Sequence, residues 1–128
     1  MSKSRRYISL AKKVAEQSDY EKFRHGAVLV RGSSVRNMAC NKHRHCHFGK
    51  RFREAHTGNA TLHAELGVIL GMDRTVTQGA TVYTARVNKE GQSRMSKPCP
   101  MCESAMRHVG IKRVVYTDRN GRIETMNL

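Results

Sequence analysis

Two short segments of the sequence carry side chains that could bind a metal ion. His63-Ala64-Glu65 opens one apolar helical pattern, and Pro98-Cys99-Pro100-Met101-Cys102 opens another. Cys99 and Cys102 are three residues apart, so one helical turn places both sulfurs on the same side. The positive end of a helix dipole favours their thiolates. With His63 they offer one nitrogen and two sulfurs, which suit zinc, and three protein ligands leave a fourth position for water, as in catalytic zinc sites.

Glu65 follows His63 by two residues and is not needed as a ligand. A carboxylate beside such a metal can take a proton from water and pass it on, which is the chemistry of hydrolytic deamination. Two other interpretations stay open. The zinc could be structural, with Cys40 or Cys46 as a fourth ligand. Alternatively, Glu65 could be a solvated acid in the first turn of a helix, where the dipole favours it.

Hydrophobic periodicity predicts the elements that must position these residues. We expect helices over Ser4–Ser18, Thr61–Met72 (with Asn59 or Thr61 as its cap) and Cys99–Val109, and strands over Ala27–Val30, Val35–Cys40, Thr81–Thr84, Arg113–Thr117 and Arg122–Met126. Helices interrupt the strands twice, which predicts an α/β fold in which helices pack on the faces of a mixed five-stranded sheet. Asn120-Gly121 makes a turn too short for a parallel crossover, so strands four and five should be antiparallel. The 128 residues fit a single domain, 1–128.

The two motifs together resemble a known family. A His-x-Glu motif followed by Pro-Cys-x-x-Cys is the signature of the zinc-dependent nucleobase deaminases, and the predicted order α-β-β-α-β-α-β-β is similar too. The chain thus resembles the zinc-dependent cytidine/deoxycytidylate deaminase superfamily, which includes tRNA adenosine deaminases. The resemblance implies a cytidine-deaminase-like three-layer fold, a catalytic zinc on His63, Cys99 and Cys102, and Glu65 as proton shuttle.

The resemblance also implies substrate contacts. Asn41 matches an asparagine that contacts the sugar or base, and the segment of His25 and Ala27 matches the strand entry that flanks the nucleoside. Ala64 and Pro98, beside the metal ligands, complete the expected substrate-binding set. Residues 86–97 form a long insertion that is similar to small phage-type CMP/dCMP deaminases, while the run at 101–106 resembles tRNA adenosine deaminases.

The charge of the chain points to a polyanionic partner. There are 24 Lys and Arg against 10 Asp and Glu, a formal charge of +14, and nine of the cations lie in the acid-free stretch 22–53. Such an excess favours nucleotides or nucleic acid, although much of it could be solvated surface. Phe48 and Phe52 in this region could stack on bases or pack the loop. No apolar run approaches the roughly 18 residues of a membrane span, and no export signal is evident. We therefore expect a cytoplasmic protein, in a host cytoplasm if it is phage-encoded.

A second group of His and Cys residues lies between 40 and 56. A structural zinc near Cys40, His43 and Cys46 is one interpretation, and a Cys40–Cys46 disulfide is another. We favour a polar loop, since closely alternating His side chains rarely converge on one tetrahedral site.

The expected function is conversion of cytosine to uracil in a cytidine nucleotide of the CMP/dCMP type. The first alternative is a deaminase acting on cytosine or adenine in single-stranded DNA or RNA. An alternative of another class is a non-catalytic, zinc-stabilised module that binds nucleic acid. By the family resemblance we also expect a homo-oligomer, a dimer or larger.

Overall fold

The computed structural model describes residues 2–18, 24–45 and 61–128, with the backbone alone described at 42–45 and 61–62. Its helices and strands are α1 (Lys3–Ala15), β1 (Arg24–Arg31), β2 (Ser34–Cys40), β3 (Lys42–His45), β4 (Thr61–Leu62), α3 (Ala64–Ile69), α4 (Arg74–Thr77), β5 (Thr81–Val87), β6 (Ser93–Arg94), α5 (Pro100–His108), β7 (Arg113–Thr117) and β8 (Ile123–Asn127). None of these helices is both long and apolar enough to cross a membrane.

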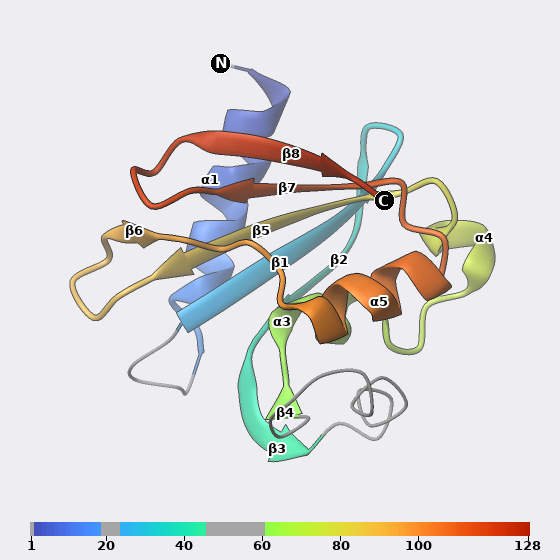
Figure 1. The fold of residues 1–128 in the computed structure, drawn as a ribbon, viewed down its shortest axis with the longest axis horizontal. Coiled ribbons are helices and arrows are strands. Elements are labelled where there is room, and N and C mark those ends of the chain that lie inside the picture. The colour runs from blue at the N-terminus through green and yellow to red at the C-terminus, as the bar shows by residue number, and fades with distance from the viewer. Residues whose placement is uncertain (1, 19–23, 46–60) are drawn as a thin grey trace.

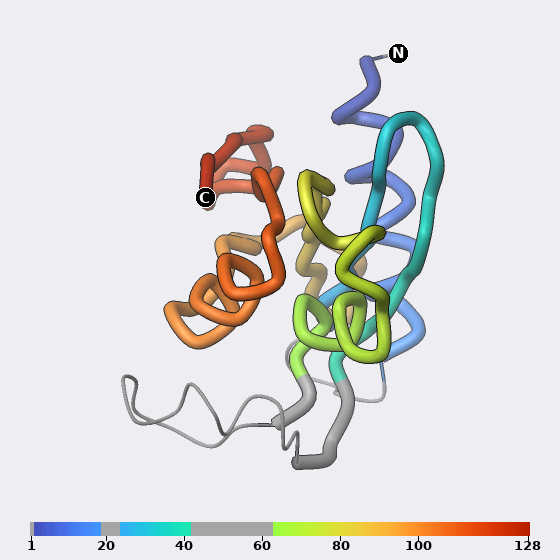
Figure 2. Tube along the Cα trace, turned by 90° about the vertical axis from the view of Figure 1, so that its right-hand side faces the viewer, coloured from blue at the N-terminus to red at the C-terminus, as the bar shows by residue number. Residues whose placement is uncertain are grey.

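One mixed sheet organises the chain. Its strand order is β2-β1-β5-β7-β8, and the short β6 pairs with the end of β5. β5 and β7 are parallel, with α5 in the crossover between them, while β7 and β8 are antiparallel. The expected mixed sheet is therefore confirmed, with its five strands and the additional two-residue β6. β2 and β8 lie at its opposite edges (Figure 2).

Side chains along each strand point alternately to the two faces of the sheet, so the core has two layers. Val28 and Val30 of β1 pack with Tyr7 and Ala11 of α1. Leu29, between them, packs with the residues of α3 and α5 on the other face. Figure 1 accordingly shows α1 behind the sheet and α5 in front of it. The expected three-layer arrangement is thus present.

The expected helix over Thr61–Met72 is wrong at both ends. Thr61–Leu62 is strand β4, which pairs with β3 (Lys42–His45). β3 lies in the region between 40 and 56 where we expected a polar loop. The helix begins only at Ala64, with His63 rather than Asn59 or Thr61 as its N-cap. It ends at Ile69, and a separate turn of helix, α4, follows with Asp73 as cap. Pairing with a distant strand, which periodicity cannot show, decides the conformation of Thr61.

α1 lies directly on the backbone of β1 at Gly26. A Cβ atom built on Gly26 would lie 2.1 Å from the carbonyl oxygen of Ala11 and 2.5 Å from the backbone nitrogen of Ala15. Those atoms belong to the helix backbone and cannot move aside alone. The glycine therefore sets how closely α1 approaches the sheet.

Substitution of Gly26→Ala should destabilise the protein by about 2 kcal/mol or more, because the helix must shift as a unit. Urea unfolding followed by circular dichroism measures the change. Ser9→Ala on the exposed side of α1 is the control and should cost less than about 0.5 kcal/mol. An unchanged unfolding midpoint for Gly26→Ala would contradict the close packing.

Candidate metal centre

The N-termini of α3 and α5 meet on one face of the sheet. His63 is the N-cap of α3, Cys99 is the N-cap of α5, and Cys102 lies in the first turn of α5. Nδ1 of His63 is 3.2 Å from Sγ of Cys102 and 3.7 Å from Sγ of Cys99. The three ligand atoms all lie within 4.8 Å of one another. Within residues 2–18, 24–45 and 61–128 this is the one such group found.

The two sulfurs differ in protonation. A hydrogen bond from the Cys102 thiol, with a smaller contribution from His63, lowers the pKa of Cys99 to about 4, although burial opposes the shift. The neighbouring Cys99 sulfur, and then burial, raise the pKa of Cys102. The hydrogen bond to Cys99 also raises the pKa of His63. The metal-free site thus holds a thiolate at Cys99 and a proton on Cys102 that a divalent cation would displace. Its donor set fits zinc.

Glu65 lies beside these ligands in the second position of α3. The residue is 3% exposed, and its Oε1 atom is buried with no hydrogen-bond partner among the described residues. Its charge raises the pKa of both His25 and Cys102, so it is close to both. A buried oxygen without a partner is costly. The site is therefore suited to a ligand that donates a hydrogen bond to Glu65.

His25 of β1 and Asn41, which directly follows β2, are hydrogen-bonded to each other at the end of the sheet where Glu65 lies. The backbone N–H of His25 donates to Oδ1 of Asn41 (2.9 Å), and the backbone N–H of Asn41 donates to the carbonyl of His25 (3.1 Å). The Ser18 hydroxyl, after α1, lies 2.5 Å from the same Oδ1. Burial lowers the pKa of His25, and Glu65 partly offsets this. Sequence reasoning missed Ser18, because its role depends on where α1 ends relative to β2.

Three other expected site residues, Ala27, Ala64 and Pro98, are buried in the protein interior. Ala27 and Ala64 are fully buried in the cluster that includes Cys102, and Pro98 is buried just before Cys99. Cys40 is a half-buried free thiol. Cys46 lies outside the described residues, as does the His43 side chain. Our preference for a polar loop over a second zinc near Cys40, His43 and Cys46 therefore stays a prediction.

A buried hydroxyl cluster holds the segment that leads into Cys99. The Ser96 hydroxyl donates to the carbonyl of Thr84 (3.0 Å), and the Thr84 hydroxyl donates to the carbonyl of Ser96 (2.8 Å). The backbone N–H of Thr117 donates to the Ser96 hydroxyl (2.8 Å), and that of Ser96 donates to the carbonyl of Thr117 (2.9 Å). Ser96 therefore ties this segment to both β5 and β7. No sequence motif signals its role.

In zinc-free protein at pH 6, iodoacetamide should alkylate Cys99 much faster than Cys102. At that pH Cys99 is ionised, since its pKa is about 4, whereas Cys102 keeps its proton. Peptide mass spectrometry over time measures both rates, with Cys40 as internal reference. Because zinc must displace the Cys102 proton, zinc affinity should rise with pH. Faster alkylation of Cys102 would contradict the assignment.

Substitution of Ser96→Ala should weaken zinc binding about tenfold, because buried groups of Thr84 and Thr117 lose their partner and the Cys99 segment loosens. Competition with a chromophoric chelator measures the affinity. Ser93→Ala is the matched control, since the Ser93 hydroxyl is buried without a partner among the described residues. Equal zinc affinities for the two variants would refute the positioning role.

Comparison with solved structures supports the fold. The chain is similar to dCMP deaminase from the cyanophage S-TIM5 (18% identity, 93% of this chain and 86% of that one, TM-score 0.64). It is also similar to a mutant cytidine deaminase from Mycobacterium tuberculosis (19% identity, 90% of this chain and 84% of that one, TM-score 0.57). A third similar structure is cytidine deaminase from Burkholderia pseudomallei (20% identity, 99% of this chain and 93% of that one, TM-score 0.58). A search of curated proteins found no match.

The sequence profile of one family matches directly. This profile describes the cytidine and deoxycytidylate deaminase zinc-binding region and matches residues 1–118. The matched range includes His63, Glu65, Cys99 and Cys102. Because the match spans nearly the whole chain, the protein belongs to the cytidine and deoxycytidylate deaminase zinc-binding family.

Proposed function

We propose that the protein hydrolyses the exocyclic amine of cytosine in a cytidine nucleotide of the CMP/dCMP type, giving uracil and ammonia. The observation that carries the proposal is the buried, unpartnered Oε1 of Glu65 beside three convergent zinc-ligand atoms. A structural zinc site would not need this carboxylate. The family membership supports the same chemistry.

In the proposed reaction His63 Nδ1 and the sulfurs of Cys99 and Cys102 hold one zinc ion. Bound there, zinc supplies Lewis acidity that lowers the pKa of water. Glu65 accepts one proton as the water oxygen bonds to C4 of the base, and it delivers this proton to ring N3. It then takes the remaining proton from the new C4 hydroxyl and passes it to the amino group, so the C4–N bond breaks, ammonia leaves and the C4 carbonyl of uracil forms.

We propose that the base binds beside Glu65 and His25, which are close enough to interact. His25 lies on one side of the carboxylate, anchored by its hydrogen bonds to Asn41. Burial excludes bulk water from Glu65 and strengthens each electrostatic interaction in the site. We propose that this end of β1 and β2, with Asn41, contacts the sugar, while Ala27, Ala64 and Pro98 form the packed wall behind the base.

The preference for a free nucleotide is supported by two observations. The first is the length of residues 86–97, which by the family resemblance suggests small phage-type CMP/dCMP deaminases, and the second is that one of the similar solved structures is a phage dCMP deaminase. The charge of +14 favours the alternative, cytosine or adenine in a single strand. We further propose a homo-oligomer in the cytoplasm, where the thiols stay reduced.

Substitution of Glu65→Gln should lower turnover by at least about a hundredfold, because the amide cannot accept the proton, while zinc stays bound. Purified protein is incubated with cytidine, CMP, dCMP, oligo-dC and a tRNA, uracil and inosine are quantified, and zinc is measured by atomic absorption. Glu103→Gln, on the half-buried side of α5 in an ion pair with Arg107, is the matched control.

Full turnover in Glu65→Gln would overturn the mechanism. Product on oligonucleotide alone, with steep salt dependence, would favour the single-strand alternative. No product on any substrate, with nucleic-acid binding that Glu65→Gln leaves unchanged, would favour the non-catalytic zinc module.

A further inference from the structure

A row of basic side chains crosses three strands and starts beside Glu65. His25 of β1 is directly opposite Arg86 of β5, and Arg86 is directly opposite Arg94 of β6. Residues directly opposite each other in antiparallel strands project from the same face of the sheet. His25, Arg86 and Arg94 therefore share one face.

That face is the one that carries the metal centre. Ala27, two residues beyond His25, and Val82, four residues before Arg86, both pack in the cluster with α3 and α5. Because strand side chains alternate between the two faces of a sheet, His25 projects to the same face as Ala27, and Arg86 to the same face as Val82. This is the face that α3 and α5 cover. The effects of Glu65, His63 and Cys99 on the pKa of His25 place the start of the row at the site.

The row leads outward from the site. His25 and Arg86 are half-buried, whereas Arg94 is exposed. Neighbouring strands lie about 4.8 Å apart, so the backbone of Arg94 is roughly 10 Å across the sheet from that of His25. A ligand that has its base at Glu65 and extends along this row would have its far end near the two arginines.

The backbone beneath Arg94 is fixed. Besides pairing with β5, the carbonyl of Arg94 accepts a hydrogen bond from the Thr117 hydroxyl (2.7 Å). Asn88 closes the β5–β6 turn, since its Oδ1 accepts from the backbone N–H groups of Glu90 and Gln92. Arg94 is therefore presented from a rigid hairpin.

The two guanidinium groups are close enough to interact, and burial together with the charge of Arg94 lowers the pKa of Arg86. Among the described residues, no carboxylate forms an ion pair with Arg94. An anion bound at Arg94 would therefore meet a guanidinium group that no described carboxylate neutralises.

We propose that Arg94, together with Arg86, forms an anion subsite that binds the phosphate of the substrate nucleotide. The proposal rests on the proposed function, because it takes the base to lie at Glu65. Arginine is suited to this role, since its planar group can give two parallel hydrogen bonds to one phosphate. The subsite would make the enzyme select a nucleotide over a nucleoside.

The test compares kcat/KM for dCMP and for deoxycytidine in the wild-type protein, Arg94→Ala and Arg36→Ala. The dCMP to deoxycytidine ratio should fall about ten- to a hundredfold in Arg94→Ala, with deoxycytidine turnover unchanged, since a charged hydrogen-bond pair is lost. Arg36→Ala removes the same charge from an exposed position on β2 and should keep the wild-type ratio. Arg94→Lys should recover only part of the loss.

An unchanged ratio in Arg94→Ala overturns the subsite and leaves the proposed function standing. The same fall in Arg36→Ala also overturns it, because general charge would then explain the effect. If wild-type protein deaminates neither compound, the proposed function fails, and calorimetric binding of dUMP decides the subsite. Weaker dUMP binding in Arg94→Ala alone would support it, and equal binding in all three proteins would overturn it.

Discussion

The site depends on the meeting of two helix N-termini over one face of the sheet. A helix start presents backbone N–H groups and a positive dipole end, and here α3 and α5 present both to the same small volume. This arrangement favours a thiolate at Cys99 and places the buried carboxyl group of Glu65 beside it. It also requires that α5 begin where the β5-to-β7 crossover places it. The parallel pair of strands is thus the element that brings Cys99 and Cys102 to His63.

Two kinds of contact hold these helices and strands in register. Buried hydroxyls of Thr84, Ser96 and Thr117 fix the segment before Cys99. On the other face, the backbone contact at Gly26 sets the position of α1. α1 leads to Ser18, whose hydroxyl meets Asn41, which in turn holds the backbone of His25. A continuous series of contacts therefore connects the packing of α1, on the far face of the sheet, to the backbone of His25 at the site.

The parts of the fold that local rules govern could be predicted. The cysteine pair follows from the spacing of one helical turn, and the strand Arg113–Thr117 has the bounds that its apolar pattern predicted. Non-local contacts could not be predicted. Thr61 pairs with a distant strand, Ser96 finds its partners on two others, and the row from His25 to Arg94 exists only once the hairpin register is known.

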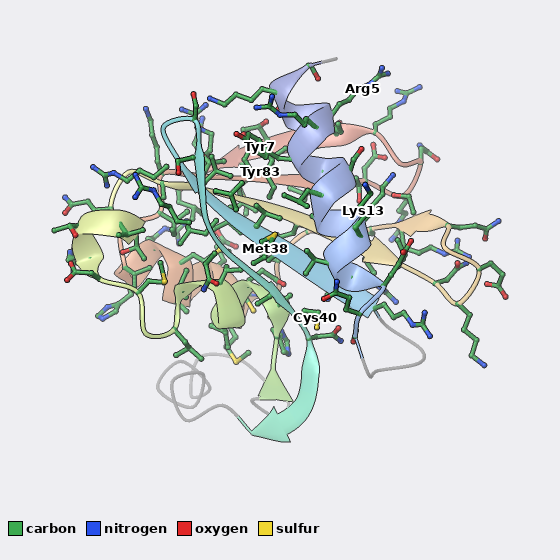
Figure 3. The ribbon with its side chains drawn as sticks, turned by 180° about the vertical axis from the view of Figure 1, so that it is seen from behind. Arg5, Tyr7, Lys13, Met38, Cys40 and Tyr83 are labelled. Atoms are coloured by element: carbon green, nitrogen blue, oxygen red, sulfur yellow. The ribbon has the colours of Figure 1, made fainter. Side chains whose placement is uncertain are left out.

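The net charge of +14 does not by itself select a polymeric substrate, because the cations that the structure describes lie on both faces of the sheet. Arg5 and Lys13 lie on α1 (Figure 3), which covers the face of the sheet opposite the metal centre. The sheet separates these charges from Glu65, so they cannot contact a phosphate next to the reacting base. At short range only cations on the metal-centre face can do so, and Arg86 and Arg94 are on it. The choice between one phosphate and a strand therefore depends on a few positions near the site rather than on the total charge.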